Sequence, residues 1–220
     1  MQSKLRELGI LIVPDATTCT HLASPHIIRT QKFICALAHA PIVLSTDFVD
    51  DCLQLNERLD PNSYLLEDAE GEGRIGHKLS DALVKAKQNK GKLLQGMQIY
   101  ATEAIHGGFD TYKAIVEVNG GKCFLYRARA GPHLVPRVNP DESDADDDDD
   151  DERLRSVYLI SGTTPAEAKL WPRFRQMVEE KGKIPLIVRN DWMLNLALSQ
   201  EIHWKDHYAL TEKDVGVDAA

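Results

Sequence analysis

The chain has 220 residues, of which 43% are hydrophobic, and its formal net charge is −8. This length and apolar content suffice for one large domain or two small ones. No apolar run reaches the roughly 18 residues of a membrane-spanning helix, so we expect no membrane association. The opening residues, MQSKLRELG, lack the apolar stretch of a signal peptide.

The acidity is concentrated in one segment. Residues 141–152 contain ten acidic side chains and no basic one. Subtracting them from the 34 acidic residues of the chain leaves 24 against 26 basic residues, a net charge of about +2. Such a tract repels itself and resists burial, so we predict a disordered loop over about 139–153. The tract has two possible roles: it attracts basic partners such as histones, or it is a plain solvated insertion.

The first 66 residues alternate short apolar segments with helix signals. We expect a helix that ends at Gly9, and two further helices whose N-caps are Thr30 and Thr46. The predicted strands cover 10–13, 21–23 and 42–44. Alternation of this kind is typical of a parallel sheet with helices on both sides.

Residues 67–78 are polar and rich in glycine, and we predict a linker there, followed by an amphipathic helix over 79–90. The linker contains Gly71-x-Gly73-x-x-Gly76, which formally matches a dinucleotide-binding fingerprint. We reject that function because no apolar strand leads into the motif. Acidic residues also precede it where a phosphate would have to approach.

A second cycle of elements follows, with strands expected over 97–101, 123–126, 157–160 and 185–188, and helices over 111–118, 165–180 and from 190 onward. Residues 41–66 align without a gap with 185–210, at an offset of 144, and Phe48 stands opposite Trp192. The two cycles therefore form an internal repeat. We expect the large aromatic residue of each final helix to anchor its core.

The sequence offers little for catalysis or metal binding. The cysteines show no CxxC spacing and indicate reduced thiols in an intracellular compartment; they lie at positions 19, 35, 52 and 123. His203 and His207 are four residues apart, but no cysteine or carboxylate pattern accompanies them, so we predict no metal site. Neither a nucleophile–base pair nor a GxxxxGK[ST] loop is present, so we expect no catalytic residues, no cofactor and no enzyme.

The strongest candidate site surrounds Thr30. Thr30 is placed to cap a helix, Lys32 falls in the first turn of that helix, and Arg29 precedes the cap. A cation in the first turn opposes the helix dipole, so helix stability alone would not select it. Backbone N–H groups and an ammonium at one place suit an anion. The alternative is a solvated basic pair on an ordinary surface helix.

The element order, the Gly120-Gly121 turn and the aromatic residue in each final helix resemble a tandem BRCT module. THLASPHIIRTQKFICAL resembles the first repeat of pairs that read phosphorylated histone tails. LLQGMQIYATEAIHGGFDTYKAIVEVNGG resembles the linker and second repeat of the fungal multi-BRCT DNA-damage scaffolds, the regulator of Ty transposition group. The resemblance implies an α/β fold of two repeats, each a parallel sheet flanked by helices: 1–66 and 93–212, joined by a linker at 67–92 and followed by a tail at 213–220.

The resemblance also implies a function and its residues. A phosphoserine or phosphothreonine would dock on the first repeat, where Lys32 matches the phosphate-holding lysine and Thr30 the helix-capping threonine. Arg29 resembles an arginine that clamps the carboxylate of a free C-terminal tail. The implied role is a non-catalytic, nuclear scaffold of the DNA-damage response. Its implied partner is the gamma-phosphorylated histone C-terminal tail at DNA breaks, or another phosphoprotein.

One departure from the family concerns the first repeat. In the family it opens with a strand that ends in Ser/Thr-Gly and supplies the other half of the phosphate pocket. That strand has no counterpart here, and its place lies between the strands that correspond to 10–13 and 21–23. We expect unpaired backbone groups and an open apolar slot, as in a fragment or truncated form of a longer scaffold.

Two further functions stay open. The pair could be a phosphate-independent scaffold that packs against a protein or DNA partner, and phosphatase treatment of the partner would separate the two cases. It could also be an unrelated α/β enzyme, although the sequence has no motif for one. Direct DNA binding is not expected, because the body of the chain carries only about +2 and lacks a basic stripe.

Overall fold

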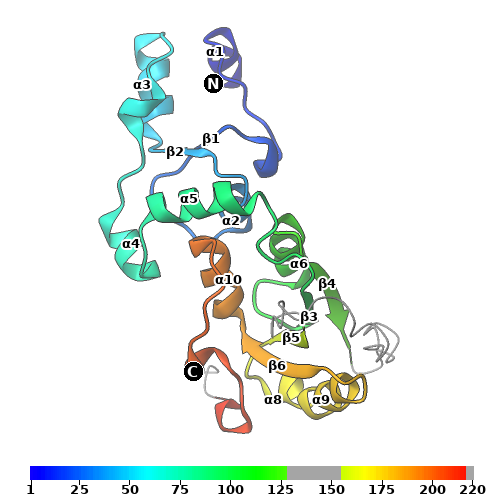
Figure 1. Ribbon diagram of the computed structural model, residues 1–220. Helices are drawn as coiled ribbons and strands as arrows, with labels where there is room; N and C mark the ends of the chain where they lie inside the picture. Colours follow the sequence, from blue (N-terminus) through cyan, green and yellow to red (C-terminus); the bar gives the residue numbers. More distant parts are fainter. Residues whose placement is uncertain (128–154, 217–220) are drawn as a thin grey trace. The chain divides into compact units, whose positions relative to one another are not determined.

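The computed structural model describes residues 1–127 and 155–216 (Figure 1). The predicted acidic loop at 139–153 lies outside these residues. The chain divides into two compact units: unit 1 comprises Met1–Gly91 and Asn195–Glu201, and unit 2 comprises Lys92–Leu194 and Ile202–Ala220. No helix within the described ranges is long and apolar enough to cross a membrane.

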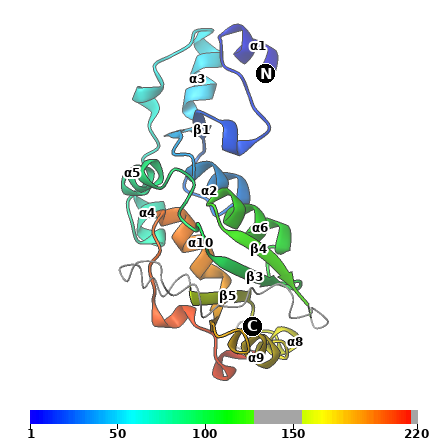
Figure 2. The same cartoon turned by 45° about the vertical axis from the view of Figure 1, so that its right-hand side comes forward.

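Unit 2 contains a parallel sheet in the order β4-β3-β5-β6, and Figure 2 shows its strands β4, β3 and β5. Its strands are β3 (Gln98–Thr102), β4 (Lys122–Tyr126), β5 (Ser156–Ser161) and β6 (Ile184–Arg189). Helix α6 (Phe109–Val118) packs on β3 and β4, and α9 (Trp171–Glu179) packs on β6. The unit also contains α8 (Pro165–Ala168), the start of α10 (Asn190–Ser199), and short 3-10 turns at Asp206–Tyr208 and Glu212–Asp214. Its core is an aromatic cluster in which Tyr100, Tyr126 and Phe174 contact one another.

Unit 1 contains a smaller parallel sheet of β1 (His21–Ala23) and β2 (Ile42–Leu44). Its helices are α1 (Gln2–Glu7), α2 (Gln31–Leu37), α3 (Asp47–Leu55), α4 (Ala69–Ile75) and α5 (Leu79–Asn89), with 3-10 turns at Ala16–Thr18 and Pro61–Tyr64. The last residues of α10 belong to this unit. Asn89 on α5 donates its side-chain amide to the carbonyl of Gln200, just after α10, at 2.7 Å.

The internal repeat is confirmed at the level of single hydrogen bonds. Leu66 donates its backbone N–H to Val43 at 3.0 Å, and Leu210 donates to Ile187 at 2.8 Å. Each residue of the second pair lies 144 positions after its counterpart in the first. The final helices also end alike, because the left-handed residues Asn56 (φ 52°) and Gln200 (φ 54°) follow α3 and α10 at the same offset. Both units are therefore copies of one α/β plan.

The aromatic anchors of the final helices are buried as predicted. Phe48 is 6% exposed and packs edge-on against Tyr64, with ring centroids 5.7 Å apart. Trp192 is 1% exposed and stacks on Tyr158 at 4.8 Å. The four cysteines are free thiols. Burial raises the pKa of Cys35 to about 11 and that of Cys123 to about 12, so both thiols are protonated at neutral pH.

The strand predicted at 10–13 is wrong. These residues have no regular secondary structure, and Leu11 and Ile12 are 65% and 50% exposed. In unit 2, the corresponding edge strand β4 pairs with the central strand β3. The described part of unit 1 has no strand between 10–13 and β1, so the backbone of 10–13 has no ladder to join.

The open slot expected beside β1 is present. A cavity of about 600 Å³ lies there, and residues 9–14 and 20–23 are among those that line it. Leu44 and Phe48 also line it, which makes much of its wall apolar. The described residues of the first repeat thus contain no N-terminal strand beside β1, and the side of β1 where it would lie opens on this cavity.

Three local predictions need correction. The glycine-rich segment 67–78, predicted as a linker, contains α4, because Asp68 accepts a hydrogen bond from the N–H of Gly71 at 2.8 Å and Gly76 ends the helix at φ 78°. Helix α3 begins after Thr46, but the Ser45 hydroxyl accepts the free N–H of Asp47 at 3.3 Å instead. The helix predicted over 165–180 is two helices, α8 and α9.

Candidate functional site

Helix α2 is fixed in unit 1 by its buried face. Phe33, Ile34 and Leu37 are at most 2% exposed, so the inward direction of the helix is set by packing. Thr30 caps the helix as predicted, because its hydroxyl oxygen accepts the N–H of Phe33 at 3.4 Å. The first turn of α2, which contains Lys32, is therefore placed by a rigid element.

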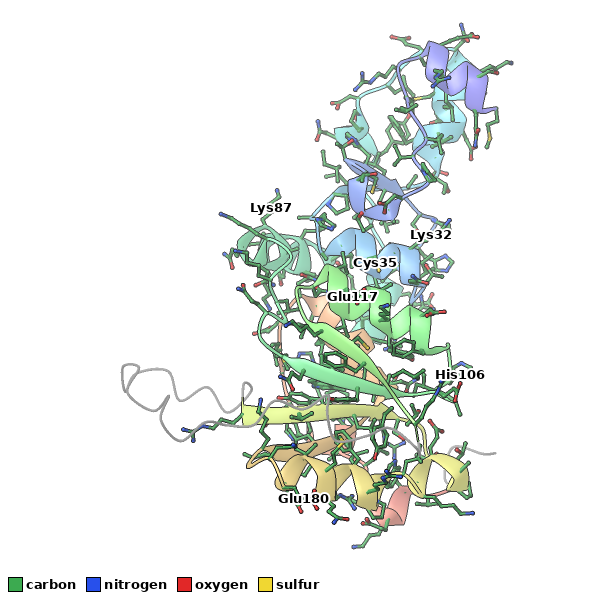
Figure 3. The ribbon with its side chains drawn as sticks, turned by 90° about the vertical axis from the view of Figure 1, so that its right-hand side faces the viewer. Lys32, Cys35, Lys87, His106, Glu117 and Glu180 are labelled. Atoms are coloured by element: carbon green, nitrogen blue, oxygen red, sulfur yellow. The ribbon has the colours of Figure 1, made fainter. Side chains whose placement is uncertain are left out.

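Lys32 is the exposed cation of this first turn (Figure 3). Its side chain lines the cavity beside β1. Within residues 1–127 and 155–216 it forms no hydrogen bond or ion pair. An ammonium with three donors and no protein partner is suited to an anionic ligand.

Arg29 lies one residue before the cap and contacts another part of unit 1. Its guanidinium donates to the side-chain oxygen of Asn195 at 2.8 Å. Asn195 is 166 residues away in the sequence, on the last part of α10, and sequence reasoning missed it. This bond engages one amino group of the guanidinium, whose planar fork is the donor geometry that matches a carboxylate.

The loop that leads to Arg29 is tied down by Asp68. One carboxylate oxygen of Asp68 accepts the N–H of Ile27 at 2.7 Å, and the other accepts the N–H of Gly71. These bonds from Ile27 and Gly71 hold the pKa of Asp68 below its ordinary value. Sequence reasoning treated Asp68 only as an obstacle to phosphate; an Asp three residues before Gly71 is also a helix-cap signal.

Arg29, Thr30 and Lys32 lie close in sequence at the start of α2, and of the three only Lys32 lines the cavity beside β1. The donor group that a central strand would add is absent from the described residues of unit 1, because β1 has no neighbour on that side. No cluster of three or more His, Cys, Asp or Glu side chains in the described ranges is arranged to hold a metal ion. The arrangement can bind an anion through an ammonium, a guanidinium and a hydroxyl.

The sequence matches known proteins over most of its length. Residues 1–66 match the family model for the Regulator of Ty1 transposition protein 107 BRCT domain. The chain is 30% identical over 210 residues to BRCT-containing protein 1 of Schizosaccharomyces pombe, an overlap of 93% of this chain and 22% of that protein. Further relatives are named for the DNA-damage checkpoint or the DNA-damage response. The chain spans between 5% and 22% of the length of these curated relatives.

Solved structures of BRCT proteins also resemble the chain. The BRCT5-BRCT6 domains of S. pombe Brc1 superpose with a TM-score of 0.67 at 25% identity, covering 97% of this chain and 92% of that one. A complex of Rtt107p and a phosphorylated histone matches with a TM-score of 0.64 at 18% identity, covering 96% of this chain and 85% of that one. The chain is a tandem BRCT pair that resembles the C-terminal pair of the fungal multi-BRCT DNA-damage scaffolds, and its first repeat lacks the N-terminal strand.

Proposed function

We propose that unit 1 binds a phosphoserine or phosphothreonine peptide and that Lys32 holds the phosphate. The observation that supports this is the exposed Lys32 ammonium, which lacks a partner in the described residues and sits two residues after the helix-capping Thr30. A phosphate carries nearly two negative charges at neutral pH and offers three acceptor oxygens. Charge-assisted hydrogen bonds to it contribute roughly 1.5–3 kcal/mol each.

Thr30 and Arg29 have different roles in this proposal. The Thr30 oxygen accepts the N–H of Phe33, and its hydroxyl proton is donated to a phosphate oxygen. Arg29 receives the carboxylate at the end of the peptide, with its guanidinium plane set by Asn195. The site therefore suits a phosphoresidue placed a few residues before a free C-terminus.

The proposed ligand is the gamma-phosphorylated C-terminal tail of a histone at DNA breaks. The structural neighbour Rtt107p is in complex with a phosphorylated histone, which supports this choice. Other relatives are DNA-damage-response proteins by name. We propose that the chain is a non-catalytic scaffold module and that it acts in the nucleus.

Titration of a fluorescent peptide that ends in phosphoserine-Gln-Glu-Leu tests the proposal. We expect binding that is lost with the unphosphorylated peptide and weakened roughly 10- to 100-fold in Lys32→Ala, the loss of one charge-assisted hydrogen bond. Lys87→Ala is the matched control, because Lys87 is an equally charged, exposed residue of unit 1 on α5. It should bind as the unchanged chain does.

Three outcomes would oppose the proposal in whole or in part. Equal affinity for the phosphorylated and unphosphorylated peptides would favour the phosphate-independent scaffold instead. Phosphate-dependent binding that survives Lys32→Ala would move the site away from α2. Binding of other phosphopeptides with free C-termini at the same strength would keep the site but reject the histone tail as its specific ligand.

A further inference from the structure

A buried carboxylate in unit 2 has no charged partner. Glu167 on α8 is 3% exposed, and within the described residues it forms no ion pair. Burying a carboxylate is costly unless hydrogen bonds replace its hydration. The groups that donate hydrogen bonds to the Glu167 carboxylate therefore stabilise its buried position.

Three donors from two segments of the chain converge on this carboxylate. The Thr102 hydroxyl donates to Oε1 at 2.5 Å, and the Gly162 N–H donates to the same oxygen at 2.9 Å. The Thr164 hydroxyl donates to Oε2 at 2.9 Å. We call this donor set, Thr102, Gly162 and Thr164, the anion pocket.

The anion pocket lies at the carboxyl edge of the sheet. Thr102 is the last residue of β3, and Gly162 follows directly after β5, its parallel neighbour. Carboxyl ends of adjacent parallel strands are the usual place for ligands in open α/β sheets. The pocket thus has the position and the donors of a ligand site, with a side chain of the same unit inside it.

The residues of the anion pocket lie in close contact with the Glu167 carboxylate. A Cβ atom on residue 162 would lie 2.5 Å from Oε2 of Glu167, so a larger residue there would push the carboxylate out of its present position. The neighbouring Ser161 is held at both ends: its hydroxyl donates to the Gly162 carbonyl at 3.0 Å and accepts from Trp171 Nε1 at 2.9 Å. These contacts link the backbone beside the pocket to the core residue Trp171.

We propose that the anion pocket of unit 2 is a small-oxyanion site occupied by the chain's own Glu167, so that this unit is closed to an external carboxylate or phosphate. The inference extends the proposed function, because it leaves unit 1 as the one unit open to a phosphate among the described residues. It does not depend on that function, since it concerns different residues and a different unit.

Chemical rescue tests the proposal in the full chain. Glu167→Ala empties the pocket and leaves its donors without a partner, so we expect a lower Tm in sodium chloride. Sodium acetate or formate at equal ionic strength should raise the Tm of this variant by about 3–6 °C, the effect of a ligand at roughly ten times its Kd. Inorganic phosphate in a parallel series determines whether the pocket accepts the larger oxyanion.

Two variants serve as controls. Glu167→Gln keeps the side-chain volume, so it should fold and show no specific response to acetate. Gly162→Ala fills the space beside the carboxylate, so it should lower the Tm without rescue by either anion. If Glu167→Ala is unfolded in chloride, recovery of the folded state in acetate is the equivalent readout.

The outcomes are distinct from those of the peptide titration. The proposal fails if acetate, formate and phosphate leave Glu167→Ala no more stable than chloride does, or if they stabilise the unchanged chain equally. Adding Lys32→Ala to the variant should leave the rescue intact, because Lys32 belongs to unit 1. A rescue that vanishes with Lys32 would assign the anion effect to unit 1 and overturn the inference.

Discussion

Among single residues, Arg29 and Asn195 form the contact that leads to the most specific prediction about peptide binding. The 2.8 Å bond joins an arginine before α2 to the last part of α10, and we propose that it helps to orient Arg29 toward a carboxylate. Lys32, by contrast, acts as a point charge that needs no such support. The phosphate and the carboxylate of a peptide should therefore respond to different substitutions.

Asn195→Ala is expected to weaken binding of a phosphopeptide with a free C-terminus roughly 2- to 12-fold, the loss of about one neutral hydrogen bond. The same peptide with an amidated C-terminus should bind more weakly from the start and lose nothing further. Titration of both peptides against both chains measures the difference. Equal losses for the two peptides would show that Asn195 supports the fold instead of the orientation of Arg29.

Between secondary-structure elements, Asp68 joins helix α4 to the loop before α2. Its carboxylate accepts one N–H from Ile27 and one from Gly71, and these bonds lower its pKa from the ordinary value near 3.8. A carboxyl group with a lowered folded-state pKa adds stability above its unfolded-state pKa. That stability is lost as the pH falls through the folded-state pKa.

Asp68→Asn should therefore lower the Tm at a pH of about 6, by about 2–4 °C on the scale of a helix cap. The deficit should shrink below the ordinary pKa of 3.8, where the unchanged chain also loses its carboxylate. Thermal melts of the two chains from about pH 2 to about pH 7 check this. Asp81→Asn on the exposed first turn of α5 is a matched control, and a deficit that stays constant with pH would contradict the linkage.

Over the whole chain, charge is distributed very unevenly. The net charge of −8 becomes about +2 without residues 141–152, which hold ten acidic side chains. A phosphopeptide is itself acidic, so we expect the tract to repel it over distances set by the Debye length, about 10 Å at roughly 0.1 M salt, wherever the two come that close.

Deletion of residues 141–152 should raise the association rate of the phosphopeptide roughly three- to tenfold at low salt. The gain should disappear near about 1 M salt, where screening is strong. Stopped-flow measurements across a salt series check both expectations, with a chain in which the ten acidic residues are replaced by Ser and Gly as the length-matched control. An unchanged association rate at low salt would rule out electrostatic repulsion by the tract.

Sequence patterns alone were sufficient for the repeat and the order of most elements, and they suggested the residues of the candidate site, which remain a prediction. The offset of 144 and the pattern around Thr30 are local or periodic signals, which survive without knowledge of contacts. Helix α4 was missed because its glycine content outweighed the cap that Asp68 provides. The strand at 10–13 was wrongly predicted because its apolar residues lack the neighbour that a strand requires.

Only the folded chain shows which residues distant in the sequence contact one another. Asn195 reaches Arg29 across 166 residues, and Thr102 reaches Glu167 across 65. No periodicity or spacing reports such contacts, because they depend on how strands and helices stack after the local elements have formed. In the sequence, Glu167 looks like an ordinary helix residue. Only the folded chain shows that it is buried and hydrogen-bonded in the anion pocket of unit 2, since burial and donor geometry arise from tertiary packing.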